Sequence, residues 1–124
     1  MIKILIVDDN KDNRTTVRLF LEDYENLSAF EADNAEKAIG IAKVSKPDII
    51  FMDIMMPGMN GIDATKEIRK FDKQSMIIAM SVLSDDEHKS QMLQAGAEDY
   101  ITKPINEELF VKRMDNYFKL IEYK

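Results

Sequence analysis

The sequence contains no cysteine and no long apolar run, and it carries no excess of basic residues. Without cysteine, disulfides and thiol catalysis are excluded, and the composition suits a reducing compartment. The longest apolar runs, such as Ile4–Val7 and Ile49–Met52, are far too short to cross a membrane, and we expect no signal peptide before them. The formal net charge of −6 argues against a general nucleic-acid surface, because phosphate backbones attract basic faces. We therefore expect a cytoplasmic protein that contacts neither membrane nor nucleic acid directly.

The length of 124 residues falls in the usual range of a single domain. At this size a domain buries roughly two-thirds of the surface that its unfolded chain exposes, so it needs no covalent cross-links. No internal repeat, low-complexity tract or interdomain linker interrupts the chain. The sequence predicts one domain over residues 1–124, with no output domain in this chain.

Three short apolar runs have the length of strands, namely Ile2–Val7, Asp48–Met52 and Met76–Met80. None of them keeps the alternation of apolar and polar residues that is typical of a sheet with one wet face. Strands buried on both faces have this pattern, which favours a parallel sheet covered by helices. Leu27–Ala32 is a weaker candidate for an edge strand, and Asp99–Thr102 is a fifth, shorter one.

Between these runs, apolar residues recur at spacings that place them on one face of a helix. The expected helical segments are marked by Val17, Phe20, Leu21 and Tyr24; by Ala35, Ala38, Ile39 and Ala42; by Ala64, Ile68 and Phe71; by a start at Ser84–Glu87 and a stop at Gly96; and by Phe110, Met114, Tyr117 and Ile121. Asn34, Ser84 and Asn106 are the expected N-caps. Five alternations of strand and helix, joined by right-handed crossovers, predict a three-layer α/β sandwich.

Chemically active residues gather directly after the apolar strands, where open α/β sheets place their sites. Asp8 and Asp9 follow the first strand and Asp53 the third, while Ser81 and Lys103 stand at the ends of the fourth and fifth. Because parallel strands end at the same edge of a sheet, we expect these groups to lie together. Three carboxylates repel one another unless a cation lies among them, and hard oxygen ligands suit Mg²⁺. The lysine and the serine hydroxyl would contact the oxygens of a phosphoryl group.

A carboxylate can attack phosphorus as a nucleophile and form an acyl phosphate. Such a transfer needs positioning and charge neutralisation rather than further covalent chemistry. Asp53 stands alone at the centre of the expected sheet and is the candidate nucleophile, whereas the adjacent Asp8 and Asp9 suit shared metal binding. Each residue alone is an ordinary surface feature, and an aspartate pair after a strand is often only a turn. The prediction depends on the conjunction of these features at successive strand ends.

Four stretches of the chain resemble response-regulator receiver domains, and the resemblance covers essentially the whole length. They are Ile4–Asn10, Pro47–Gly61, Ile77–Ser81 and Gly96–Pro104. The resemblance implies a (βα)5 flavodoxin-like doubly wound fold whose five-stranded parallel sheet has the order 2-1-3-4-5. It also implies a two-component signalling role, in which a histidine kinase or a histidine phosphotransfer protein donates the phosphoryl group.

The resemblance assigns roles position by position. Asp53 would be the phosphoacceptor, and Asp9 and Asp53 would bind Mg²⁺ directly, with Mn²⁺ able to replace it. Asp8 would act on the metal largely through water, and the backbone carbonyl of Met55 would be a further ligand. Lys103 would bind the phosphoryl group.

The resemblance further implies a switch made of the Ser81 hydroxyl and the Tyr100 ring. Phosphate would draw Ser81 inward and Tyr100 would fill the vacated space, which reshapes the face of the fourth helix, fifth strand and fifth helix for a downstream protein. The bond between Lys103 and Pro104 is typically cis in this family. Val82 departs from the Ala or Gly usual at its position, and we hypothesise that its bulk slows both phosphorylation and attack by water.

Two other functions stay open, that of a contact-only receiver and that of a phosphohydrolase. A degenerate receiver would signal by contact alone, although such domains commonly lose part of the acid–lysine set that this chain retains. A metal-dependent phosphohydrolase of the haloacid-dehalogenase type would carry a second aspartate two residues after the nucleophile, where Met55 stands. A flavin binder of the same sheet order would need a hydroxyl- and glycine-rich loop where Asp8 and Asp9 stand. We therefore expect a domain that only phosphorylates and dephosphorylates itself and is otherwise no enzyme.

Overall fold

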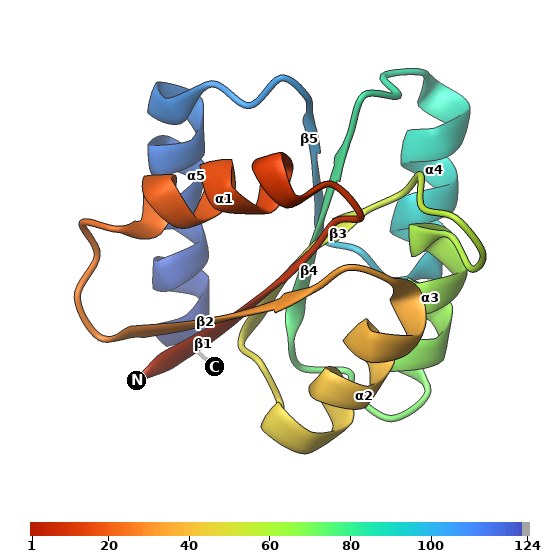
Figure 1. The fold of residues 1–124 in the computed structure, drawn as a ribbon, viewed down its shortest axis with the longest axis horizontal. Helices are drawn as coiled ribbons and strands as arrows, with labels where there is room; N and C mark the ends of the chain where they lie inside the picture. The colour runs from red at the N-terminus through yellow and green to blue at the C-terminus, as the bar shows by residue number, and fades with distance from the viewer. Residues whose placement is uncertain (123–124) are drawn as a thin grey trace.

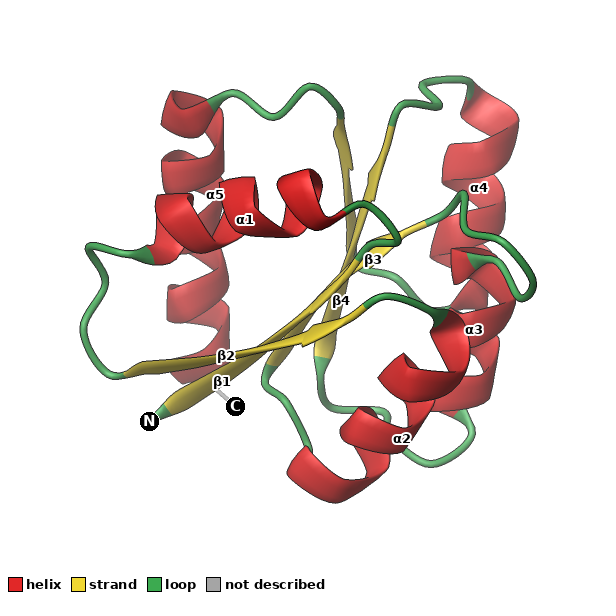
Figure 2. Cartoon of the chain, in the orientation of Figure 1, coloured by secondary structure: helices red, strands yellow, loops and turns green. Residues whose placement is uncertain are grey.

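A central sheet of five parallel strands in the order β2-β1-β3-β4-β5 organises the computed structural model, which describes residues 1–122. Strands and helices alternate along the chain: β1 (Ile2–Val7), α1 (Lys11–Leu21), β2 (Leu27–Ala32), α2 (Ala35–Ser45), β3 (Ile49–Asp53), α3 (Gly61–Arg69), β4 (Met76–Ser81), α4 (Asp86–Ala95), β5 (Asp99–Thr102) and α5 (Glu107–Glu122). Helices α1 and α5 cover one face of the sheet, and α2, α3 and α4 cover the other (Figures 1 and 2). The α/β class and the strand order expected from the sequence are confirmed.

Each strand contributes to two hydrophobic cores, one on either side of the sheet. In β1, Leu5 and Val7 point toward α2, α3 and α4, whereas Ile4 and Ile6 point toward α1 and α5. All five residues of β3 are buried, which explains why its sequence lacks alternation. Burial of each large aliphatic side chain contributes about 1.5–3 kcal/mol to folding, so both helical layers are held on the sheet mainly by these contacts.

The helices begin at short polar side chains that accept a backbone N–H. Asn10, Asn34 and Asn60 cap α1, α2 and α3, and Asn106 accepts from the amide of Leu109 at the start of α5. The expected cap Ser84 was wrong by one position, because the Asp85 carboxylate accepts from the His88 amide and begins α4 there.

Two aromatic residues expected on helical faces lie beyond the helix ends. Tyr24 lies past α1, although its ring packs edge-on against Phe118 at 5.2 Å between centroids. Phe71 lies past α3 and is 41% exposed, so its prediction on the apolar face of that helix was wrong. The Asp72 carboxylate accepts the backbone N–H groups of Gln74 and Ser75, and this turn redirects the chain directly after Phe71.

The chain enters α5 through a cis peptide bond between Lys103 and Pro104, as the resemblance implied. Within residues 1–122, none of the helices combines the length and the apolar composition that a membrane crossing requires.

Candidate functional site

Three carboxylates meet at the edge of the sheet where β1 and β3 end side by side. Asp8 and Asp9 lie directly after β1, and Asp53 is the last residue of β3. One oxygen atom from each carboxylate lies within 4.8 Å of the others. Asp8 and Asp53 are buried, at 5% and 6% exposure, whereas Asp9 is exposed to solvent. The structure thus brings together the three acids that the sequence singled out.

Lys103 supplies the positive charge of this cluster. It directly follows β5, a strand that does not neighbour β3. In the sheet, β4 separates β5 from β3, and the Lys103 side chain reaches back across the end of β4. Its Nζ lies 2.5 Å from Asp8 Oδ2 and 3.6 Å from Asp53 Oδ2. Its backbone N–H donates to the Ser81 carbonyl at 2.8 Å, which fixes the start of this path. One ammonium therefore faces two of the three carboxylates, those of Asp8 and Asp53.

Asp8 is oriented by the turn into α1. Its Oδ1 accepts from the backbone N–H of Asn10 at 2.9 Å and from Asn13 Nδ2 at 3.4 Å, while Oδ2 faces Lys103. Asn10 is also the N-cap of α1, and its side chain accepts the backbone N–H of Asn13. The structure shows that the same residues that begin α1 also hold the buried carboxylate.

Burial raises the pKa of Asp53 to about 6, and the Asp8 and Asp9 carboxylates push it in the same direction. The Lys103 ammonium and a backbone hydrogen bond from Met55 lower the pKa of Asp53, but they offset only part of this rise. The site therefore holds more negative charge than its own cation neutralises, and a further cation would favour the ionised form of Asp53. A set of hard carboxylate oxygens with one solvent-facing member fits Mg²⁺, which keeps several waters in its coordination sphere.

The turn after Asp53 depends on a residue that sequence reasoning did not single out. A Cβ atom on Gly61 would lie 2.0 Å from the carbonyl oxygen of Asp53, so no side chain fits there. The Gly61 N–H donates to the Ile54 carbonyl at 2.9 Å and closes the turn. The loop leaves the side chain of Met55 exposed, which agrees with a role for its backbone alone.

Ser81 and Tyr100 meet at the backbone of Leu83. Ser81 ends β4 with no exposed surface, and its Oγ accepts the Leu83 N–H at 3.2 Å. The Tyr100 hydroxyl donates to the Leu83 carbonyl at 2.6 Å, and its half-buried ring packs on the core below α4. Leu83 links the two proposed switch residues through main-chain atoms, so its side-chain identity carried no signal in the sequence.

The raised pKa of Asp53 predicts a pH-dependent effect of Asp53→Asn on stability. A folded-state pKa of about 6 against an ordinary 3.8 means that the fold favours the protonated acid. The protonated Asp53 therefore stabilises the folded state below pH 4, and this contribution to the free energy of unfolding is lost as the pH rises through 6. In EDTA at pH 7.5, Asp53→Asn should raise the free energy of unfolding by about 1–2 kcal/mol, a range reduced for solvent screening. Urea unfolding at pH 7.5 and pH 4 measures this, and a gain of equal size at both values would contradict it.

Comparisons with known proteins agree with this geometry. The family model of the response regulator receiver domain matches residues 4–115. The chain is 37% identical to the chemotaxis protein CheY of Thermotoga maritima over 121 residues, which cover 94% of this chain and 98% of CheY. It is 34% identical to the response regulator GacA of Pseudomonas aeruginosa over 119 residues, which cover 95% of this chain but 56% of GacA. The chain thus spans little more than half of that longer relative.

A solved structure gives the same result in three dimensions. The receiver domain of Ssk1 from Saccharomyces cerevisiae, crystallised with the histidine phosphotransfer protein Ypd1, superposes with a TM-score of 0.85 and 31% identity. The match covers 94% of this chain and 88% of that one. Sheet order, acidic cluster and sequence relatives together show that this chain belongs to the response-regulator receiver family of two-component signalling.

Proposed function

We propose that this domain accepts a phosphoryl group on Asp53 from a histidine kinase or a histidine phosphotransfer protein, in the cytoplasm and with Mg²⁺ bound. The observation that carries the proposal is a buried carboxylate at a strand end, beside two other acids and within 3.6 Å of the Lys103 ammonium. Asp9 and Asp53 would bind the metal directly, Asp8 largely through water, and the Met55 carbonyl would complete the protein ligands. Mn²⁺ would serve in its place.

The Asp53 carboxylate is the nucleophile of the proposed reaction. One of its oxygens forms a bond to phosphorus while the bond from phosphorus to the donor imidazole nitrogen breaks, and the product is an acyl phosphate. When bound, Mg²⁺ supplies neutralisation of the phosphoryl charge. Lys103 neutralises the same charge from the side of β5, and its short contact to Asp8 holds it in reach of the incoming oxygens. Later attack by water on phosphorus breaks the bond between phosphorus and the Asp53 oxygen, releases inorganic phosphate and restores the carboxylate.

The phosphoryl group would be sensed through Ser81 and Tyr100. Because Ser81 Oγ accepts the Leu83 N–H, the hydroxyl proton of Ser81 can be donated to a phosphoryl oxygen. Movement of Ser81 toward phosphate would free space for the Tyr100 ring, whose hydroxyl donates to the Leu83 carbonyl in this structure. Phosphorylation then acts as a population shift, because phosphate binds one arrangement of β4, α4 and β5 better than the other.

A relative supports the phosphodonor class of partner, and exposed side chains of this chain support a downstream partner. The yeast relative was crystallised with a histidine phosphotransfer protein, which supports the donor class. Large apolar side chains are exposed on α4 and α5, as expected of a surface that binds a downstream protein. They are Leu93 on α4 and Leu109, Val111 and Leu120 on α5. We infer that the downstream protein binds the face formed by α4, β5 and α5.

Intact mass after incubation with acetyl phosphate and Mg²⁺ tests the proposal. We expect a gain of one phosphoryl group that is absent in Asp53→Asn and absent in EDTA. No gain from either acetyl phosphate or a purified histidine kinase would indicate a receiver that signals by contact alone. Repeated turnover of small phosphate esters would instead indicate a phosphohydrolase.

Val82 gives a test of access to the phosphoacceptor. It follows Ser81 directly and its side chain is 65% exposed, so its bulk lies at the surface beside the site. We expect Val82→Ala to raise both the rate of phosphorylation by acetyl phosphate and the rate of dephosphorylation several-fold, because the smaller side chain admits donor and water. Val44→Ala, at an exposed position on α2, is the matched control. Unchanged rates in Val82→Ala would show that this side chain does not limit access.

A further inference from the structure

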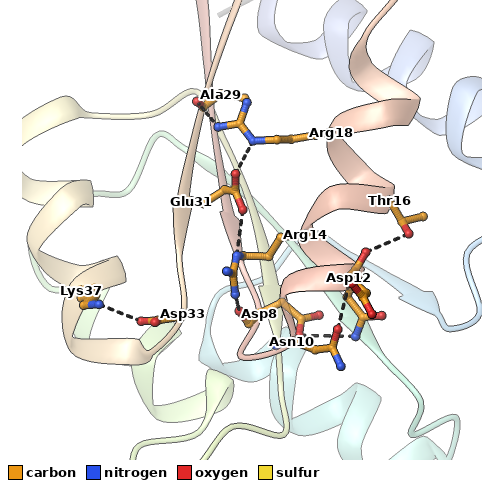
Figure 3. Close-up of polar contacts among 11 residues, drawn as sticks. Asp8, Asn10, Asp12, Arg14, Thr16, Arg18, Ala29, Glu31, Asp33 and Lys37 are labelled. Carbon is orange, nitrogen blue, oxygen red and sulfur yellow. Dashed lines mark hydrogen bonds and ion pairs between the residues drawn. The ribbon is translucent and has the colours of Figure 1, made fainter.

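The Arg14 side chain joins the edge strand of the sheet to the acidic turn (Figure 3). Arg14 lies on α1, and its side chain is only 14% exposed, so it is part of the packed structure rather than a free surface charge. Its Nε donates to Glu31 Oε1 on β2 at 2.8 Å, and its Nη1 donates to the backbone carbonyl of Asp8 at 2.7 Å. One rigid guanidinium thus contacts two separate segments with two directional hydrogen bonds.

These contacts hold the Asp8 main chain from both sides. Its N–H donates to the Ala32 carbonyl of β2 at 3.1 Å, and its carbonyl accepts from Arg14. The carbonyl carbon of Asp8 is bonded to the nitrogen of Asp9, and the peptide unit between them is planar. Arg14 therefore fixes the plane from which Asp9 projects.

Asp9 is the member of the acidic cluster that has the greatest need of such support. Asp8 is held by Asn10, Asn13 and Lys103, and Asp53 is buried at the end of β3. The Asp9 carboxylate is exposed, and within residues 1–122 its side chain makes no hydrogen bond or ion pair. Its position depends on the backbone alone.

Glu31 anchors Arg14, and it does the same for a second arginine. The Arg18 Nε contacts the other oxygen of the same carboxylate, and its Nη2 donates to the Ala29 carbonyl at 2.9 Å. Burial would raise the pKa of Glu31, but the hydrogen bonds from both arginines outweigh it and hold the pKa below its ordinary value. Arg18 therefore shares the anchor but contacts only β2, whereas Arg14 alone of the two reaches the acidic turn.

We propose that Arg14 is a positioning residue of the metal site: it holds the backbone at Asp8 so that Asp9 presents its carboxylate to Mg²⁺, with Glu31 on the edge strand as its anchor. This inference rests on the proposed function, because it takes Asp9 to be a metal ligand. It gives β2, which supplies no residue to the acidic cluster, a defined part in setting the geometry of that cluster. Loss of a residue that orients a metal ligand typically weakens metal affinity 10–100-fold.

The test compares Arg14→Met with Arg18→Met, because both variants remove one of the two arginines on Glu31 and only the first removes the contact to Asp8. The dissociation constant for Mg²⁺ is measured by NMR titration of the full chain with MgCl₂. We expect a rise of about tenfold in Arg14→Met and a change below about twofold in Arg18→Met. Glu31→Gln, which weakens the anchor and keeps its size, should fall between them.

A second measurement needs no metal. In EDTA, the backbone ¹⁵N order parameter of Asp9 should fall in Arg14→Met and stay at the wild-type value in Arg18→Met, since only the first frees the peptide unit. If Arg14→Met does not fold, Arg14→Lys replaces it with the same expectation, because an ammonium lacks the fork that reaches both acceptors.

The outcomes separate this inference from the function on which it rests. A wild-type chain that binds no Mg²⁺ would overturn the proposed metal site. A wild-type chain that binds Mg²⁺, with equal affinities in Arg14→Met and Arg18→Met and unchanged order at Asp9, would overturn the positioning role alone.

Discussion

Repulsion among three carboxylates at one sheet edge is the constraint on which the rest of this structure depends. Asp8, Asp9 and Asp53 bring three formal negative charges within 4.8 Å of one another, and Lys103 returns one positive charge. Two of the acids are buried, where water screens their repulsion poorly. The fold tolerates this arrangement because more than twenty buried apolar side chains on the two faces of the sheet stabilise the strands that carry the acids. The excess negative charge favours a further cation at this site.

The parallel topology supplies the geometry that the charges require. Neighbouring strands β1 and β3 bring the acids together, while the order β3-β4-β5 sets Lys103 two strands away from Asp53. The lysine stem spans that distance, so its ammonium approaches the acids from the side opposite Asp9's strand. Ser81 ends β4, the strand between β3 and β5, and its carbonyl accepts the backbone N–H of Lys103. The functional groups therefore come from four strand ends: the Asp8 and Asp9 pair from β1, and one residue each from β3, β4 and β5.

Much of this arrangement could be predicted from the sequence because it follows from strand ends. The non-alternating runs indicated buried parallel strands, and the acids, the serine and the lysine after them defined the candidate site. Helix boundaries were less predictable. The sequence does not show that Asp72 turns the chain after Phe71, or that Asp85 rather than Ser84 begins α4. These outcomes depend on competition between adjacent polar side chains for the same backbone amides, and the difference in free energy between such caps is small.

Contacts through the backbone were out of reach of sequence reasoning altogether. Arg14 donates to the Asp8 carbonyl, and Tyr100 donates to the Leu83 carbonyl. Every residue has a backbone carbonyl, so neither contact requires a particular residue type at the acceptor position. The close approach of Gly61 to the Asp53 carbonyl does require a particular residue type, since only glycine fits there. That signal is ambiguous in one sequence, because a glycine after a strand is equally common in an ordinary turn.

The electrostatic basis of the site is tested most directly by the affinity for Mg²⁺ of Lys103→Met, measured beside the wild-type chain and Asp9→Asn. If excess negative charge drives metal binding, removal of the ammonium should tighten Mg²⁺ binding and removal of the Asp9 charge should weaken it. Both shifts should diminish at high ionic strength. Weaker binding in Lys103→Met, with its fold intact, would contradict this view and show that the lysine orders the carboxylates rather than competing with the metal for them.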